Sequence, residues 1–238
     1  PAPIVGPDGW LRLGYQAWDP PFTNYPDSQR RLHIAHLCVT GIDVQLWTDD
    51  GRTFCDVAPG NYYSQPVDWL ADTAITTGVT PTVYGFDQPV TRAQMATFLW
   101  RLMGEPAPAG PDSFIDTPLG AFYSRAVAWL AEAGITTGVS QNRFDPDGTV
   151  TRAQMATFLW RLVDTPASTN PLQFIDVDPG RFYAQAVAWL AEAEITTGVA
   201  PDRVDPDGTV TRVQMATFLC RLTRTSDYTT TGAPTPTC

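Results

Sequence analysis

The sequence predicts a mainly α-helical fold made of three tandem two-helix repeats, with a small β-containing segment before them. The first observation is a segment that recurs at intervals of 60 residues, at 90–102, 150–162 and 210–222. The second is that apolar residues in each copy stand at helical spacing, as Met155, Phe158 and Leu162 do. Repetition at a fixed period indicates supersecondary modules that stack or close into a ring.

Five segments are expected along the chain. Irregular and short-strand structure occupies residues 1–53, and a Thr- and Pro-rich tail occupies residues 224–238. The three repeats lie between them, at 54–113, 114–173 and 174–223.

The N-terminal segment contains two apolar stretches, at 32–39 and 42–47, that predict short strands. An Asp-Asp-Gly sequence at 49–51 predicts a hairpin turn after them. His33 and His36 would face opposite sides of a strand, and no third ligand is evident, so a metal site is not expected.

Each repeat opens with Phe-x-Asp, and its first helix follows. In the third repeat this helix is expected at 182–193, with Phe182 and Trp189 on its apolar stripe and the tryptophan in the core. Pro66 is tolerable only in the opening turn of a helix, so we expect the first helix of the first repeat to start late. The aspartates of the opening motif are expected to serve turns or caps; they are Asp56, Asp116 and Asp176.

An Ile-Thr-Thr-Gly sequence and a loop separate the two helices of a repeat. In the second repeat the loop ends in Asp-Pro-Asp-Gly at 145–148, which predicts a turn. The Asp-x-Asp-Gly order also occurs in calcium loops. The remaining Asp and Glu ligands of an EF-hand are lacking, so the turn is the preferred interpretation.

The second helix begins with a capping signature. A threonine stands at the N-cap, and a glutamine follows three residues later, so each side chain can bond the backbone N–H of the other. The pairs are Thr91 and Gln94, Thr151 and Gln154, and Thr211 and Gln214.

An arginine follows the capping threonine in every repeat, as Arg92, Arg152 and Arg212. The helix macrodipole disfavours a cation at this first helical position. Two explanations are open: the arginine and the free backbone N–H groups share an anion, or the arginine pairs with a nearby aspartate. The later arginines Arg101, Arg161 and Arg221 stand near the helix C-terminus, where the dipole favours them and no further role is needed.

Composition limits the possible partners. The net charge is −10, and the chain has no lysine, so all 15 positive side chains are arginines. A field of this sign repels nucleic acid and anionic membranes, and neither is expected as a partner. No apolar run approaches the ~18 residues of a membrane span, so no membrane insertion is expected. An anionic ligand would need a few local arginines.

The cysteines are Cys38, Cys55, Cys220 and Cys238, and none forms a CxxC pair. Of the three possible pairings we favour the local one, Cys38 with Cys55 and Cys220 with Cys238, each worth about 3 kcal/mol in the chain-entropy model. Disulfides imply an oxidising, extracellular compartment. The alternative is that the cysteines are reduced and buried.

The order of these motifs resembles that of the S-layer homology (SLH) domain family. The shared features are Phe-x-Asp-Val, an aromatic-led helix, Gly-Ile-Thr-Thr-Gly, Phe-x-Pro and Val-Thr-Arg-Ala-Gln, from residue 54 to about 222. The resemblance implies a pseudo-threefold, three-pronged spindle around a central three-helix bundle. It also implies grooves between modules that bind secondary cell-wall polysaccharide through its pyruvylated terminal sugar.

The resemblance also implies the carbohydrate-binding residues. The arginine that contacts the anionic group in the family matches Arg92, Arg152 and Arg212. The aromatic residue that opens the family's first helix matches Tyr62, Phe122 and Phe182. The family's loop glycine matches Gly78, Gly138 and Gly198.

The chain departs from the family pattern in three ways. The motif glutamate is glutamine in every repeat, which keeps the capping box but removes a charge. The tyrosine that often follows the loop glycine is a valine: Val79, Val139 or Val199. In the third repeat the motif alanine is Val213 and the loop phenylalanine is Val204, which predicts a degenerate groove there.

A non-covalent cell-envelope anchor is the preferred function, at the cell surface in the cell wall or surface layer. The alternative is a structural subunit that assembles with copies of itself into a surface layer or extracellular filament. An enzyme is not expected, and neither is a cofactor, because Ser/His/Asp arrangements, metal clusters and glycine-rich phosphate loops are lacking.

Overall fold

The computed structural model describes residues 54–225 and Tyr228, together with the strand positions 4–5, 11–12, 35–40 and 43–48. The chain divides into two compact units. One consists of Pro1–Pro59 and Thr77–Gly85, and the other of Gly60–Thr76 and Phe86–Cys238.

The first unit contains an antiparallel sheet in the order β1-β2-β3-β4. The strands are β1 (Ile4–Val5), β2 (Leu11–Arg12), β3 (Ala35–Thr40) and β4 (Asp43–Thr48). The two expected strands are therefore present as β3 and β4. The hairpin turn expected at 49–51 and the side chains of His33 and His36 lie outside the described residues.

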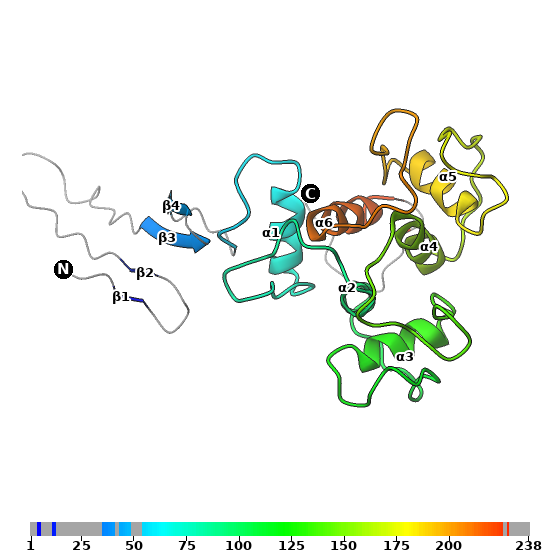
Figure 1. Ribbon diagram of the computed structural model, residues 1–238, viewed down its shortest axis with the longest axis horizontal. Helices are drawn as coiled ribbons and strands as arrows, with labels where there is room; N and C mark the ends of the chain where they lie inside the picture. The colour runs from blue at the N-terminus through cyan, green and yellow to red at the C-terminus, as the bar shows by residue number, and fades with distance from the viewer. Residues whose placement is uncertain are drawn as a thin grey trace, which may run out of the picture. The chain divides into compact units, whose positions relative to one another are not determined.

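The second unit is helical, as expected, and its described part contains six helices (Figure 1). The first helices of the repeats are α1 (Ser64–Asp72), α3 (Ser124–Glu132) and α5 (Ala184–Glu192). The second helices are α2 (Arg92–Leu102), α4 (Arg152–Leu162) and α6 (Arg212–Leu222). Among the described residues, no helix has the length and apolar character needed to cross a membrane.

The second helices begin where the capping signature predicts. At α2, Thr91 Oγ1 accepts the N–H of Gln94 at 3.3 Å, and Gln94 Oε1 accepts the N–H of Thr91 at 3.2 Å. The capping box recurs at α4 and α6. These helices supply much of the core, because Met95, Leu99 and their equivalents in the other repeats are fully buried.

Two expectations for the first helices are wrong. The helix of the third repeat begins at Ala184, not at Phe182, and the ring of Phe182 is exposed while that of Tyr183 is buried. The helix of the first repeat does not start late. It begins at Ser64, the position equivalent to Ser124, because Pro66 falls within the opening turn, where its missing N–H costs nothing.

The helices pack between repeats. The second helix of each repeat packs against the first helix of the next, so α2 lies against α3, α4 against α5, and α6 against α1 (Figure 1). Backbone bonds follow the same cycle: the N–H of Val150 donates to Val90, that of Val210 to Val150, and that of Val90 to Val210, each at 2.9 Å. The helical repeats therefore close into a ring of three, in which the last meets the first.

The linkers between repeats are fastened by glutamates at the ends of first helices. Glu132 accepts the N–H of Ala109 at 2.8 Å. Glu192 accepts the hydroxyls of Thr169 and Ser168 and the N–H of Thr169. These donors, the Thr169 hydroxyl first, lower the pKa of Glu192 to about 2.

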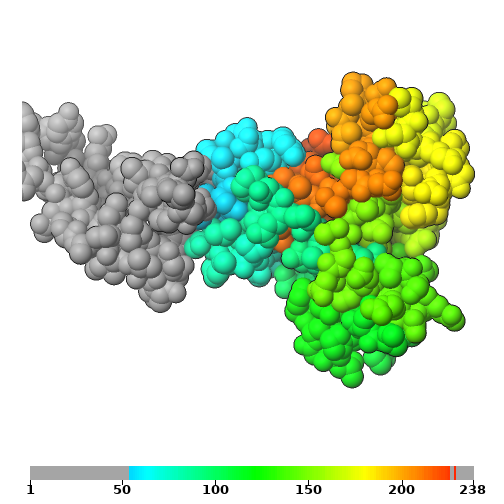
Figure 2. Space-filling model, in the orientation of Figure 1, coloured from blue at the N-terminus to red at the C-terminus, as the bar shows by residue number. Residues whose placement is uncertain are grey.

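In Figure 2 the green second repeat and the yellow start of the third form separate projections.

Candidate functional site

The N-terminus of each second helix is closed by the loop of the next repeat. The N–H of Arg92 donates to Gly148 O at 2.8 Å, and that of Ala93 donates to Pro146 O at 2.9 Å. Equivalent bonds run from residues 152 and 153 to the third repeat, and from residues 212 and 213 to the first. The expectation that free helix N–H groups share an anion with the arginine is therefore wrong. Only the arginine side chain is available for that role.

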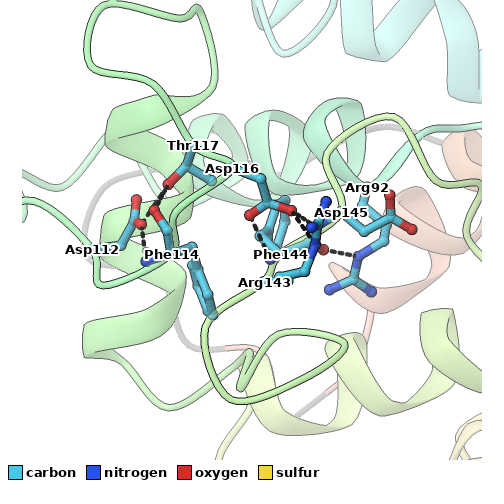
Figure 3. A network of polar contacts seen from close by, with 8 residues as sticks. All are labelled: Arg92, Asp112, Phe114, Asp116, Thr117, Arg143, Phe144 and Asp145. Carbon is cyan, nitrogen blue, oxygen red and sulfur yellow. Dashed lines mark hydrogen bonds and ion pairs between the residues drawn. The ribbon is translucent and has the colours of Figure 1, made fainter.

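Asp116 holds the loop in place. Its two carboxylate oxygens accept the backbone N–H groups of Phe144 and Asp145 at 2.8 and 2.9 Å, and Arg143 lies 3.6 Å away (Figure 3). Burial acts to raise the pKa of Asp116, but the backbone donors and Arg143 outweigh it, so that pKa lies below its usual range. Asp56 and Asp176 accept the equivalent N–H groups, so all three aspartates hold a loop that lies farther along the chain in the same repeat.

The Asp-Pro-Asp-Gly segment is a turn, as expected, because the N–H of Gly148 returns to Asp145 O at 3.1 Å. Among the described residues, no cluster of three or more His, Cys, Asp or Glu side chains is arranged to hold a metal ion.

The loop places Phe144 against Arg92. The Nε of Arg92 donates to Phe144 O at 2.6 Å, and its guanidinium carbon lies 4.7 Å from the Phe144 ring centre (Figure 3). The same carbon lies 5.5 Å from the ring centre of Phe158. Both ring faces favour a cation. Burial lowers the pKa of Arg92, while Asp145 and Asp116 act in the opposite direction.

One nitrogen of Arg92 is buried without a partner among the described residues. The side chain is buried, and Nη2 has no hydrogen-bond partner among the described residues. A buried, unpaired guanidinium nitrogen is costly unless something accepts its protons. The arginine is therefore held by three contacts and keeps one buried nitrogen whose protons no described residue accepts.

Arg92 lines a cavity of about 400 Å³ that is built from all three repeats. Gly138, Gln154 and Arg161 contribute from the second repeat, and Phe182 from the third. The structure thus brings together three of the predicted site residues, Arg92, Gly138 and Phe182. Each comes from a different repeat, because the repeats are arranged in a ring.

Arg161 belongs to this cavity although the sequence suggested no role beyond the helix dipole. Its Nη1 donates to Ile135 O at 3.2 Å, and Arg101 and Arg221 make the equivalent bonds to Ile75 and Ile195. These bonds fix the Ile-Thr-Thr-Gly segment to the second helix. Arg161 nevertheless lines the same cavity as Arg92, which no local signal in the sequence indicates.

The aromatic residues of the predicted site are exposed. Phe182 keeps 67% of its surface accessible, and Tyr62 and Phe122 keep 64% and 68%. Each packs edge-on against the tyrosine that follows it, at a ring distance of 5.1 Å. A supported but exposed ring is suited to lie against the apolar face of a sugar.

The predicted site glycines have a structural reason. Gly138 has a φ of 78°, and a Cβ there would lie 2.6 Å from the Phe114 ring and closer still to Arg143 O. Gly78 and Gly198 stand in the same conformation with equivalent neighbours. Only glycine allows the loop to close over the phenylalanine of the Phe-x-Asp motif.

The other two arginines have different surroundings. Arg212 is buried, its Nη2 donates to Thr76 Oγ1 at 3.4 Å, and its guanidinium lies 5.4 Å from the Phe98 ring. Arg152 instead pairs with Asp205, with 3.3 Å between Nη1 and Oδ2. Val204 stands at the position of Phe144, in the loop that closes the helix start at Arg152 and not the one at Arg212.

Neither Cys55 nor Cys220 is a free thiol. Cys38 and Cys238 lie outside the residues whose side chains are described, so the pairing of Cys38 with Cys55 and of Cys220 with Cys238 stays a prediction. The end of the described chain does turn back, because the Tyr228 hydroxyl donates to Leu102 O at 3.3 Å.

Comparison with known proteins matches the second and third repeats to a domain family. The S-layer homology domain matches residues 116–156 and 173–216, and each match contains the first helix of a repeat and the start of its second. An S-layer protein of Bacillus thuringiensis subsp. finitimus is 26% identical over 72% of this chain and 21% of its own length. A cell surface protein of Thermoanaerobacter kivui is 34% identical over 45% of this chain and 15% of its own.

The chain is also similar to part of an enzyme. Exoglucanase XynX of Acetivibrio thermocellus is 26% identical over 91% of this chain and 20% of its own length. The chain thus spans about a fifth or less of these relatives.

Proposed function

Because the chain belongs to the S-layer homology domain family, we propose that it anchors non-covalently to the cell envelope by binding an anionic cell-wall polysaccharide. The family and its relatives place the chain at the cell surface. The proposed role is binding, with no bond made or broken. The proposed architecture is a pseudo-threefold spindle around α2, α4 and α6, which the cyclic packing of the helices supports.

The unpaired Nη2 of buried Arg92 carries this proposal. A ketal-linked pyruvate on a terminal sugar supplies a carboxylate, which accepts charge-assisted hydrogen bonds from a guanidinium. Arg161 adds a second positive charge to the cavity, and the exposed ring of Phe182 provides a face for the sugar. A volume of about 400 Å³ accommodates one or two sugar residues, within the usual range of small-molecule sites.

The test is binding to purified cell walls that carry the polymer and to walls stripped of it. Arg92→Met keeps the apolar stem between the phenyl rings but removes the guanidinium. Loss of one desolvated charge-assisted pair costs about 1.5–3 kcal/mol, a factor of about ten or more in affinity.

Arg203→Ala is the matched control, because it removes the same charge from an exposed side chain that does not line the cavity. Wall binding should survive in this variant. Equal retention on stripped walls, or unchanged affinity of a folded Arg92→Met variant, would refute the anchoring site.

A second candidate is a structural subunit that assembles into a surface layer. The names of relatives support it, and so do large apolar side chains that stay exposed, Ile115 at 71% and Leu119 at 83%. Sedimentation of the protein without wall material distinguishes the two functions. Assembly by the protein alone supports the structural role, whereas a monomer that binds only polymer-bearing walls supports the anchor alone.

A further inference from the structure

Arg92 and Arg152 stand at equivalent positions, yet their guanidinium groups have different partners. That of Arg92 is held by Phe144 and keeps one nitrogen unpaired. That of Arg152 forms an ion pair with Asp205 at 3.3 Å, and its side chain is 14% exposed. The arginine of the second repeat therefore already has a carboxylate partner within the chain.

The loops that face the two arginines have the same backbone. Asp145 and Asp205 are equivalent, both have a positive φ (60° and 54°), and both donate their N–H to the aspartate of the Phe-x-Asp motif. Both turns close on a glycine, at 3.1 and 3.0 Å. The backbone thus does not explain why only one of these aspartates pairs with its arginine.

The difference lies in the residue before the aspartate. Phe144 places its ring against the guanidinium of Arg92 at 4.7 Å. Among the described residues Arg92 forms no ion pair with Asp145, although the Asp145 charge acts to raise the pKa of Arg92. The equivalent residue in the third repeat is Val204, which has no aromatic face. The Nη1 of Arg152 lies next to Gly208, where an added Cβ would overlap both that nitrogen and the Asp205 carboxylate.

We propose that Asp205 is an internal substitute for the ligand carboxylate, so that the groove of Arg152 is closed to the polymer while that of Arg92 is open. The proposal rests on the proposed function, because it takes the ligand to be a carboxylate-bearing sugar. The proposal concerns specificity, because Val204 and Asp205 together determine which of the equivalent grooves binds the sugar.

A gain-of-binding experiment tests this proposal. In the double variant Arg92→Met/Arg212→Met only Arg152 remains, and affinity for a methyl glycoside carrying a ketal-linked pyruvate should fall at least about tenfold. Adding Val204→Phe and Asp205→Asn to the double variant should raise its affinity for this glycoside again by at least about tenfold. Adding Asp202→Asn instead removes the same charge from an exposed position in the same loop and should restore nothing.

The outcomes separate this inference from the function on which it rests. If the double variant binds as the wild-type protein does, the arginine site itself is wrong. A second outcome is that the double variant loses binding and that adding Val204→Phe and Asp205→Asn does not restore it. If thermal unfolding shows that this chain is folded, the proposed role of Asp205 is refuted, while the proposed anchoring function stands. Recovery that persists after Arg152→Met also refutes the proposed role of Asp205. In the otherwise wild-type chain, Val204→Phe with Asp205→Asn should raise the number of sugars bound per chain by one, and an unchanged number opposes the proposal.

Discussion

A matched pair of glycines tests whether close packing shapes the loop next to Arg92. Gly134 and Gly138 are four residues apart, and both have a positive φ, of 69° and 78°. A Cβ on Gly134 would meet nothing within 4 Å, whereas a Cβ on Gly138 would overlap Phe114 and Arg143 O. The other repeats already carry Ala74 and Glu194 at the position of Gly134, so a side chain is accepted there.

The expected magnitudes differ by a factor of about three. Gly134→Ala adds only the cost of a left-handed backbone, about 1 kcal/mol, which lowers the melting temperature by about 2–4 °C in a domain of this size. Gly138→Ala adds the same cost and separates Val139 N from Arg143 O, now 2.8 Å apart, together with the Ser140–Arg143 bridge. The total is about 3 kcal/mol or more, or about 6–12 °C.

Thermal unfolding followed by circular dichroism measures both variants under one set of conditions. Similar decreases in melting temperature for Gly134→Ala and Gly138→Ala would show that backbone conformation alone accounts for these glycines. Close approach of neighbouring atoms would then not explain Gly78 and Gly198 either.

Two further predictions concern exposure and pH. Phe182→Ala should change the free energy of unfolding by about 0.5 kcal/mol or less yet weaken polymer binding several-fold. Trp189→Ala empties a core site and should lower the free energy of unfolding by about 3–5 kcal/mol. Equal destabilisation by the two changes would contradict the assignment of Phe182 as an exposed ring. Acid should destabilise the fold, because the pKa values of Asp116 and Glu192 are lowered in the folded state. The contributions of these two carboxylates to stability are complete above their unfolded pKa values of 3.8 and 4.5. They are lost as pH falls toward the folded pKa values, which for Glu192 is about 2. Urea titrations between pH 6 and pH 2.5 should show a smaller decrease in Glu192→Gln than in the wild type, and a parallel decrease would show that the linker bonds to Thr169 do not couple to protonation.

The second helices could be predicted to the residue, because their boundaries depend on local chemistry. A threonine and a glutamine three residues apart satisfy N–H groups within one turn, so the start at Arg92 needs no knowledge of the rest of the chain. The first helices were predicted less well. The apolar character of Phe182 suggested a buried stripe, but the ring that is buried belongs to Tyr183.

The composition of the cavity could not be predicted from one repeat. Arg92 meets Phe144 of the next repeat, although Tyr84 stands at the same position in its own. A sequence that repeats itself does not distinguish these partners, because both are chemically suitable. The choice follows from packing of α2 against α3, which depends on the whole ring. For the same reason the sequence alone does not show that the loop of Val204 closes the helix that begins at Arg152.

The backbone bonds that join Val90, Val150 and Val210 in a cycle have a consequence for the number of repeats. An open array such as a solenoid can gain or lose a member, because its end repeats expose faces that capping units cover. Here the loop of each repeat closes the start of the second helix in the preceding repeat, and the start of its own second helix is closed by the loop of the following repeat. A two-repeat chain would leave one loop and one helix without partners, and a fourth repeat would have no junction to enter. Closure thus sets the copy number at three, and gene duplication or deletion within this part of the chain must act on the whole ring at once.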